Sequence, residues 1–411
     1  MKAIRWTVAG LALALLIGCQ PSEPAATATP SPIVVPSATP SPSVGQPTPA
    51  ATAESTPKPT NVDPTPTPSI ESRVNYLMTT WDGQSFSRTE LEIMENGPVF
   101  LEIIRTTDDP KKKVSAFVSL RETYGSVLAD ATRNFGGSPS YVEVVLEHLD
   151  DKSPALQTAA LRAAPHSMGD DPVPQVQSEL ARLLTESSDA RVRFLAEEAL
   201  DQTEAGPPEF VTAARLQALD DPKDYVVAKV LHDLNVDDVR DQAALQNKLF
   251  ELLNHKSPAV RGEAIKRLSD MPRNHVKAEF VATVIRPFLK DPHPYPRGRA
   301  VIALGDLLKE NAIPDIVELA ADKKESRYEL EFKDPTGEAD SVEDWTYSWG
   351  RVDEAVVRKI AAITYDKPYA FNPGPIFYET RVEDIEREAE RLKPWYEKHR
   401  EVLLKGAPKR D

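Results

Sequence analysis

The sequence is poorest in cysteine, with a single one, Cys19, in 411 residues. One thiol cannot close a disulfide within the chain or supply a zinc–thiolate or iron–sulfur site. The seven histidines never stand four residues apart and none precedes a glutamate, so the common zinc-helix motif is missing. Phosphate-binding glycine loops, dinucleotide fingerprints and hydrolase nucleophile elbows are missing too. We therefore predict no catalytic residues, no metal and no cofactor.

Basic residues and long apolar runs are also scarce. The 49 lysines and arginines face 64 aspartates and glutamates, and the formal net charge is −15. Because an acidic surface repels phosphate backbones, we expect no nucleic-acid partner. The apolar run Val8–Ile17 is shorter than the ~20 residues that a transmembrane helix needs. With Lys2 and Arg5 before it, this run is typical of a signal peptide, here residues 1–18.

The segment Leu16-Ile17-Gly18-Cys19 directly follows the apolar run and resembles the lipobox of bacterial lipoproteins. The resemblance implies cleavage before Cys19 and diacylglycerol on its thiol. The alternative is an ordinary signal peptide with an incidental cysteine. We expect lipidation at Cys19, a membrane as partner through that lipid, and a location in the cell envelope. The location is the outer membrane if the organism has one.

Residues 19–69 form the anchor and a linker. Positions 20–69 hold fourteen prolines and nine threonines, and they contain no aromatic residue. Such a segment buries too little apolar surface to offset the entropy of ordering it. Repeated Thr-Pro and Ser-Pro steps favour the extended polyproline II conformation. The composition predicts a disordered spacer.

From about residue 70 a helical unit recurs, marked by a short turn with Asp, Ser or His before Pro or Ala. The six turns are Asp109-Pro110, Ser153-Pro154, Asp189-Ala190, Asp221-Pro222, Ser257-Pro258 and His293-Pro294. Six residues after each turn stands an alanine, and these are Ala116, Ala160, Ala196, Ala228, Ala264 and Ala300. Leucine usually follows one turn later, at positions 120, 200, 268 and 304. The pattern predicts that each unit begins a helix at the turn and packs its alanine against a neighbouring helix.

Residues 192–200, 260–268 and 296–304 resemble second helices of HEAT repeats. The resemblance implies an all-α fold, a right-handed α-solenoid of HEAT-like helix pairs, over residues 70–321. It also implies that Arg193, Arg261, Arg297 and Arg358, which share one repeat position, form a ladder to aspartates in neighbouring turns. A basic ladder for an acidic ligand is the alternative. Within the repeat, we expect Ala264 to face a neighbouring helix and Glu263 to face solvent.

The pattern breaks in residues 322–411. Tyr328–Phe332 and Trp345–Trp349 alternate at the strand period, which predicts a small β-hairpin insertion near the C-terminus. Trp345, Tyr347 and Trp349 then share one face. A further helical unit at 357–361, a proline- and aromatic-rich loop at 365–378 and a final helix at about 382–404 complete the segment.

Residues 325–400 carry twelve of the 28 aromatic residues in the chain, and 325–354 carry ten acids against three bases. This aromatic, acidic module either caps the last repeat or recognises a protein or cell-wall glycan partner. The residues predicted to bind are Trp345, Tyr347, Trp349, Tyr369, Phe371 and Tyr378. Acids between 334 and 344 allow a calcium site, but their order fits no EF-hand loop. The function indicated is a binding scaffold, and the alternative is an envelope enzyme, possibly glycan-directed, with a site in residues 325–380.

Overall fold

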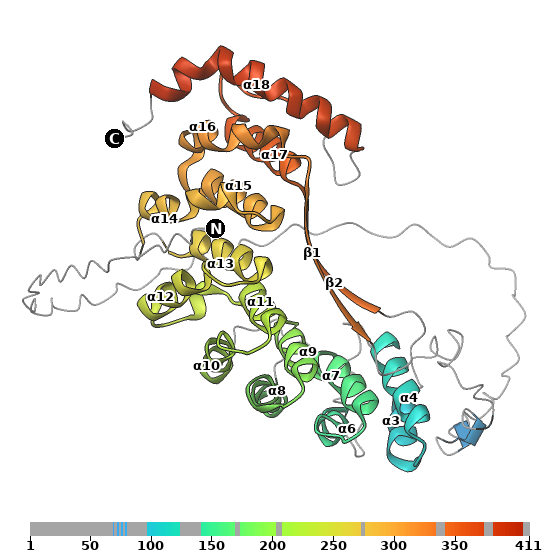
Figure 1. Cartoon of the computed structure of the whole chain (residues 1–411). Helices are drawn as coiled ribbons and strands as arrows, with labels where there is room; N and C mark the ends of the chain where they lie inside the picture. Colours follow the sequence, from blue (N-terminus) through green and yellow to red (C-terminus); the bar gives the residue numbers. More distant parts are fainter. Residues whose placement is uncertain are drawn as a thin grey trace, which may run out of the picture. The chain divides into compact units, whose positions relative to one another are not determined.

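The computed structural model divides into two units, residues 1–65 and 66–411. The structure describes residues 97–123, 141–168, 173–202, 208–272, 276–333, 342–373 and 381–405, with a few positions between 69 and 79. The predicted signal peptide, Cys19 and the predicted linker lie outside these residues, apart from Ser69. Within them the chain is mostly α-helical and has one two-stranded sheet (Figure 1), so the all-α class is confirmed.

The helices of the second unit form pairs in two layers. The first members are α3 (Gly97–Thr106), α6 (Tyr141–His148), α8 (Pro174–Glu186), α10 (Glu209–Ala218), α12 (Gln242–Leu252) and α14 (Ala278–Ile285). The second members are α4 (Pro110–Thr123), α7 (Pro154–Met168), α9 (Ala190–Asp201), α11 (Asp224–Asp233), α13 (Pro258–Asp270) and α15 (Pro294–Leu308). Each first helix packs on its own second helix, and each second helix packs on the next. The row of second helices continues to α17 (Val352–Thr364) (Figure 1).

The alanines and leucines of the repeat lie in the core between these helices. All six alanines are completely buried, and the four leucines are buried too. Alanine lets the backbones of adjacent second helices approach closely, and leucine one turn later fills the space that remains. The predicted register of the repeat is therefore confirmed in all six units.

Five of the six turns start their helix at the predicted residue. The exception is the fourth unit, where α11 begins at Asp224, two residues after Pro222. There the Asp221 carboxylate accepts a hydrogen bond from the Lys223 main-chain N–H at 2.8 Å, which closes the turn before the helix starts. Asp189 and His293 cap their helices by accepting from the N–H groups of Arg191 and Tyr295.

Between α15 and α17 the pairing of helices is interrupted. Short turns of α16 (Ile313–Ile316) and η5 (Val317–Ala321) lead into β1 (Glu325–Lys333), which pairs antiparallel with β2 (Val342–Arg351). Ser326 lies against Gly298 of α15, where a side chain on the glycine would collide with it. We term the antiparallel pair of β1 and β2 the ribbon. The close approach of β1 to α15 at Ser326 therefore fixes one end of the ribbon to the helices.

The chain ends in α18 (Val382–Lys405), an amphipathic helix that packs on α17 and η5. It buries Ile385, Ala389, Leu392, Tyr396 and Leu403, which recur at helical spacing along one face. The predicted final helix is confirmed to within one residue. Within the part of the chain that the structure covers, no helix is both long and apolar enough to span a membrane.

Candidate functional site

The repeated arginines form ion pairs from one unit to the turn of the next. Arg193 Nε lies 2.5 Å from Asp221 Oδ2, Arg261 Nε 2.9 Å from Asp291 Oδ2, and Arg297 Nε 2.7 Å from Asp322 Oδ2. Arg193 and Arg261 also donate from Nη2 to the second carboxylate oxygen, so their pairs are bidentate. The predicted structural ladder is confirmed at these three positions, and these guanidiniums are engaged within the fold.

The fourth arginine pairs within its own helix. Arg358 Nη2 lies 2.7 Å from Glu354 Oε1, one turn earlier in α17. Glu354 stands at i−4 from the arginine, where an opposite charge pairs readily on a helix surface. For Arg358 the ladder to an aspartate of a neighbouring turn stays a prediction.

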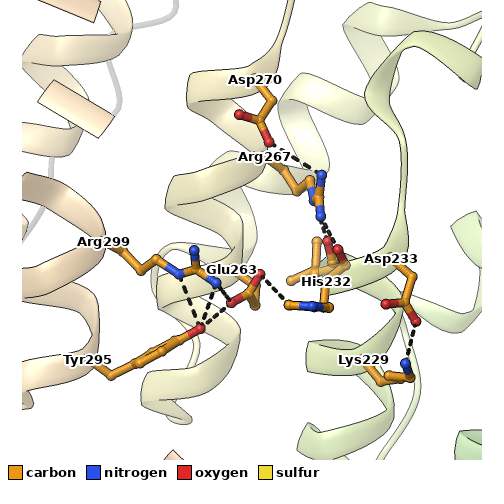
Figure 2. Close-up of polar contacts among 9 residues, drawn as sticks. Lys229, His232, Asp233, Glu263, Arg267, Asp270, Tyr295 and Arg299 are labelled. Carbon is orange, nitrogen blue, oxygen red and sulfur yellow. Dashed lines mark hydrogen bonds and ion pairs between the residues drawn. The ribbon is translucent and has the colours of Figure 1, made fainter. Parts of the chain in front are cut away.

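A second polar cluster, which we term the Glu263 network, joins three consecutive second helices (Figure 2). Glu263 of α13 accepts hydrogen bonds from Arg299 and from the Tyr295 hydroxyl, both of α15. Its other carboxylate oxygen lies 3.4 Å from His232 Nδ1 of α11. Nearby, Arg267 donates to the main-chain carbonyls of Leu231 and His232 at the end of α11.

Glu263 therefore does not face solvent, and the expectation for this residue was wrong. Its side chain is completely buried beside Ala264. A carboxylate can occupy that position because Arg299 compensates its charge and the Tyr295 hydroxyl replaces part of its lost hydration. Those partners stand more than thirty residues away in the sequence, and for that reason the local pattern of α13 gives no sign of them.

The network sets the charge states of its members. Burial alone would raise the pKa of Glu263, but the nearby Arg299, His232 and Tyr295 together lower it to about 2. Burial and the neighbouring carboxylate raise the pKa of Tyr295. Asp233, paired with Lys229 at 2.9 Å, has its pKa raised by burial to about 6. Since the Glu263, Arg299 and Tyr295 side chains are at most 3% exposed, the network is built to join helices and offers a ligand little surface.

The predicted binding residues of β2 and of the loop have different placements. Trp345 and Tyr347 lie in β2, where the register pairs them with Leu330 and Tyr328 of β1, and Trp349 follows in the same strand. Tyr378 lies outside the described residues. The structure therefore places three of the aromatics in one strand.

Tyr369 and Phe371 lie where the loop after α17 meets α18. Phe371 is buried with 3% exposure, so its ring belongs to the packing between loop and helix. Tyr369 is half-buried, and its main-chain carbonyl accepts a hydrogen bond from the Trp395 indole Nε1–H at 3.0 Å. The Trp395 ring meets Phe371 edge-on, with centroids 5.5 Å apart.

An open groove of about 620 Å³ lies beside these rings. Its lining consists of Ala370, Phe371 and Asn372 from the loop and Arg387, Glu390, Arg391, Pro394 and Trp395 from α18. The α18 residues lie three, four and seven positions apart and so occupy one face of the helix. Sequence analysis missed these helix residues as a site, although an amphipathic helix with a tryptophan next to a proline was a visible signal.

One acid of the module, Asp353, is held by a structural contact, whereas the acids between 334 and 344 lie outside the side chains that the structure describes. Burial raises the pKa of Asp353, and its side chain is completely buried against Arg351, with Nη2 and Oδ2 2.6 Å apart. Across the described ranges, no three histidine, aspartate or glutamate side chains converge as metal ligands. Comparison with known proteins gives no further guide, because no family model and no curated protein matches the chain.

Proposed function

We propose that this protein is a lipid-anchored scaffold of the bacterial cell envelope that binds its partner through an α-solenoid of HEAT-like helix pairs and the aromatic module at its C-terminal end. The six-fold repeat of buried alanines, together with the inter-unit arginine pairs, is the observation that carries this proposal. In such an array the repeated internal contacts build the stack and leave outward positions available for recognition.

The placement of charged groups favours a scaffold over an enzyme. Among the described residues, the acids whose pKa is raised by burial are Glu197, Asp233, Asp270 and Asp353, and each is paired with a cation. A hydrolytic site would instead need such an acid in an open cleft, next to the reacting bond.

The predicted linker completes this proposal. Fifty residues of extended polyproline II chain would span on the order of 150 Å at ~3.1 Å per residue. A lipid on Cys19 would hold the chain at a membrane, and the spacer would let the helical array reach a protein or a cell-wall glycan some distance away.

A paired binding and stability measurement on the full chain tests the recognition role of the module. We would immobilise wild-type protein and the Trp345→Ala and Trp349→Ala variants, and expose each to solubilised envelope proteins and to purified cell-wall glycan. If the module recognises a partner, at least one variant loses that partner while its melting temperature stays near the wild-type value.

A purely capping role gives the opposite result. Both variants would then lose stability, by ~3–5 kcal/mol if the rings are fully buried, and would keep the partner when folded. That outcome would remove the module from the proposed function.

A further inference from the structure

We propose that the groove between residues 370–372 and α18 binds a neutral saccharide, with the Trp395 ring as its stacking surface. This inference rests on the proposed function in one respect, since it gives the recognition module a ligand class. It depends on side chains in α18 and in the preceding loop, not on the ribbon.

The indole of Trp395 is held in a fixed orientation. Its Nε1–H is bonded to the Tyr369 carbonyl, and its ring packs against Phe371 on one side and His399 on another, with centroids 5.5 and 5.6 Å apart. The side chain is half-buried and also lines the groove, so part of the ring is available. A rigid aromatic ring binds the apolar C–H face of a sugar with little further loss of side-chain entropy.

The polar groups of the groove mix donors with acceptors. Arg387 and Arg391 present guanidinium N–H groups, Glu390 presents a carboxylate, and Asn372 offers both an amide donor and an amide acceptor. Pro394 lies inside α18 and has no N–H to donate to the main-chain carbonyl of Glu390 one turn earlier. A sugar hydroxyl both donates and accepts, so neighbouring hydroxyls match such a set.

The charge balance of the groove favours a neutral ligand over an anion. Arg387 Nη1 lies 2.8 Å from Asp384 Oδ1, and Arg391 pairs with Glu388, so each guanidinium already has a carboxylate beside it. Glu390 adds a further negative charge at the lining. A carboxylated or phosphorylated ligand would meet this charge within a net acidic protein.

The size of the groove also suits a short saccharide. Its volume of about 620 Å³ falls in the range of sites for small molecules, roughly 300–1,000 Å³, and it is open to solvent. A groove of this size cannot take up a folded domain, and an open groove lets a longer glycan chain continue beyond it.

Titration of the full-length chain with defined oligosaccharides tests the inference. The probes are chitotetraose and cellotetraose as neutral ligands and tetragalacturonate as an acidic one, followed by calorimetry. We expect a neutral probe to bind and the acidic probe to bind at least tenfold more weakly. Binding of neither neutral probe, or tighter binding of the acidic one, would overturn the proposal.

Variants of exposed lining residues locate the site. Arg387→Ala and Asn372→Ala should each weaken binding by about tenfold while the melting temperature stays unchanged, because both side chains are exposed. Trp395→Phe keeps an aromatic ring and should weaken binding less than Trp395→Ala. Arg240→Ala is the matched control, since Arg240 is also an exposed, ion-paired arginine, placed outside the groove lining. Affinity that is the same in all these variants would contradict the assignment of the groove.

Failure of this inference is distinguishable from failure of the proposed function. If no saccharide binds but the chain still captures an envelope protein that Trp345→Ala releases, the groove proposal alone falls. If a saccharide binds in the groove but the native chain carries no lipid, the proposal of a lipid-anchored scaffold is contradicted and the proposal of a saccharide groove is kept.

Discussion

At the scale of single residues, Ala264 and Glu263 show what a local sequence pattern can and cannot predict. An alanine stands at the repeat position of Ala264 in every unit, and that periodicity predicts its burial correctly. Glu263 stands next to it and is just as buried, but the signal for its burial lies in Tyr295 and Arg299 of the following unit. A pairing between side chains over thirty residues apart leaves no trace in local periodicity.

The burial of Glu263 predicts a large effect of removing its charge. Glu263→Leu should lower the free energy of unfolding by about 3–5 kcal/mol, because it leaves Arg299 buried without its carboxylate. Urea unfolding followed by circular dichroism measures this. Glu251→Leu is the control, since that glutamate is 72% exposed on α12 and its loss should cost under about 1 kcal/mol. Equal losses in both variants would contradict the role of the network.

Asp233 predicts a pH dependence of stability. Its pKa in the folded protein is raised from 3.8 to about 6, so the folded state binds the proton more tightly than the unfolded state does. The stability this group contributes is therefore complete below pH 4 and is lost as the pH rises through about 6. Asp233→Asn should flatten the profile over this window, by a slope of at most ~1.4 kcal/mol per pH unit. Unfolding curves measured between pH 4 and pH 7 would show parallel profiles if the expectation is wrong.

At the scale of elements, the sequence locates helix ends well where a turn residue precedes proline. The starts of α4, α7, α13 and α15 and both ends of α18 agree with the prediction to within one residue. The start of α11 differs because the Asp221 carboxylate accepts from the Lys223 main-chain N–H within the turn and also binds Arg193, and the second of these contacts comes from the neighbouring unit. Helix ends set by local chemistry are predictable, and an end set by contacts with the adjacent unit is not.

The ion pairs between repeated arginines and the next turn predict that lysine cannot fully replace arginine in stabilising the fold. Arg261 donates to both oxygens of Asp291 and to the main-chain carbonyls of His255 and Lys256. We expect Arg261→Ala to lower the free energy of unfolding by about 3–5 kcal/mol. Arg261→Lys should recover only part of this loss, because a single ammonium cannot reproduce the planar fork. Chemical denaturation of both variants measures the effect, and full recovery by lysine would contradict the bidentate contribution.

At the scale of the whole molecule, the sequence predicts the class of fold but places the candidate site only in part. The six aromatics proposed for binding lie in the strand, in the loop or beyond the described residues, whereas the groove is completed by Arg387, Glu390 and Trp395 of α18. These side chains look like the ordinary solvent face of an amphipathic helix. They form a site only because the loop at 370–372 packs beside them, and that is a tertiary contact.

The proposed lipid anchor on Cys19 predicts the mass of the N-terminal peptide of the native protein. The native protein should begin at Cys19 and carry acyl chains, which mass spectrometry of the N-terminal peptide detects. Cys19→Ser should appear in the soluble fraction or remain unprocessed. A native chain in which Cys19 bears no lipid would contradict the anchor and leave the fold untouched.

The Glu263 network also bears on how the array opens. In a stack of similar units, each unit usually loosens almost independently of distant ones, starting from the ends. Because the network ties α11, α13 and α15 through one buried carboxylate, separating α13 from α15 leaves Glu263 and Arg299 without their charge partners, and separating α11 removes the contact of His232 with the same carboxylate. These three helices should therefore exchange their amide hydrogens at a common slow rate, as one cooperative block, and Glu263→Gln should let their rates diverge. An array built this way would resist pulling at its fourth to sixth pairs and yield first toward its N-terminal pairs.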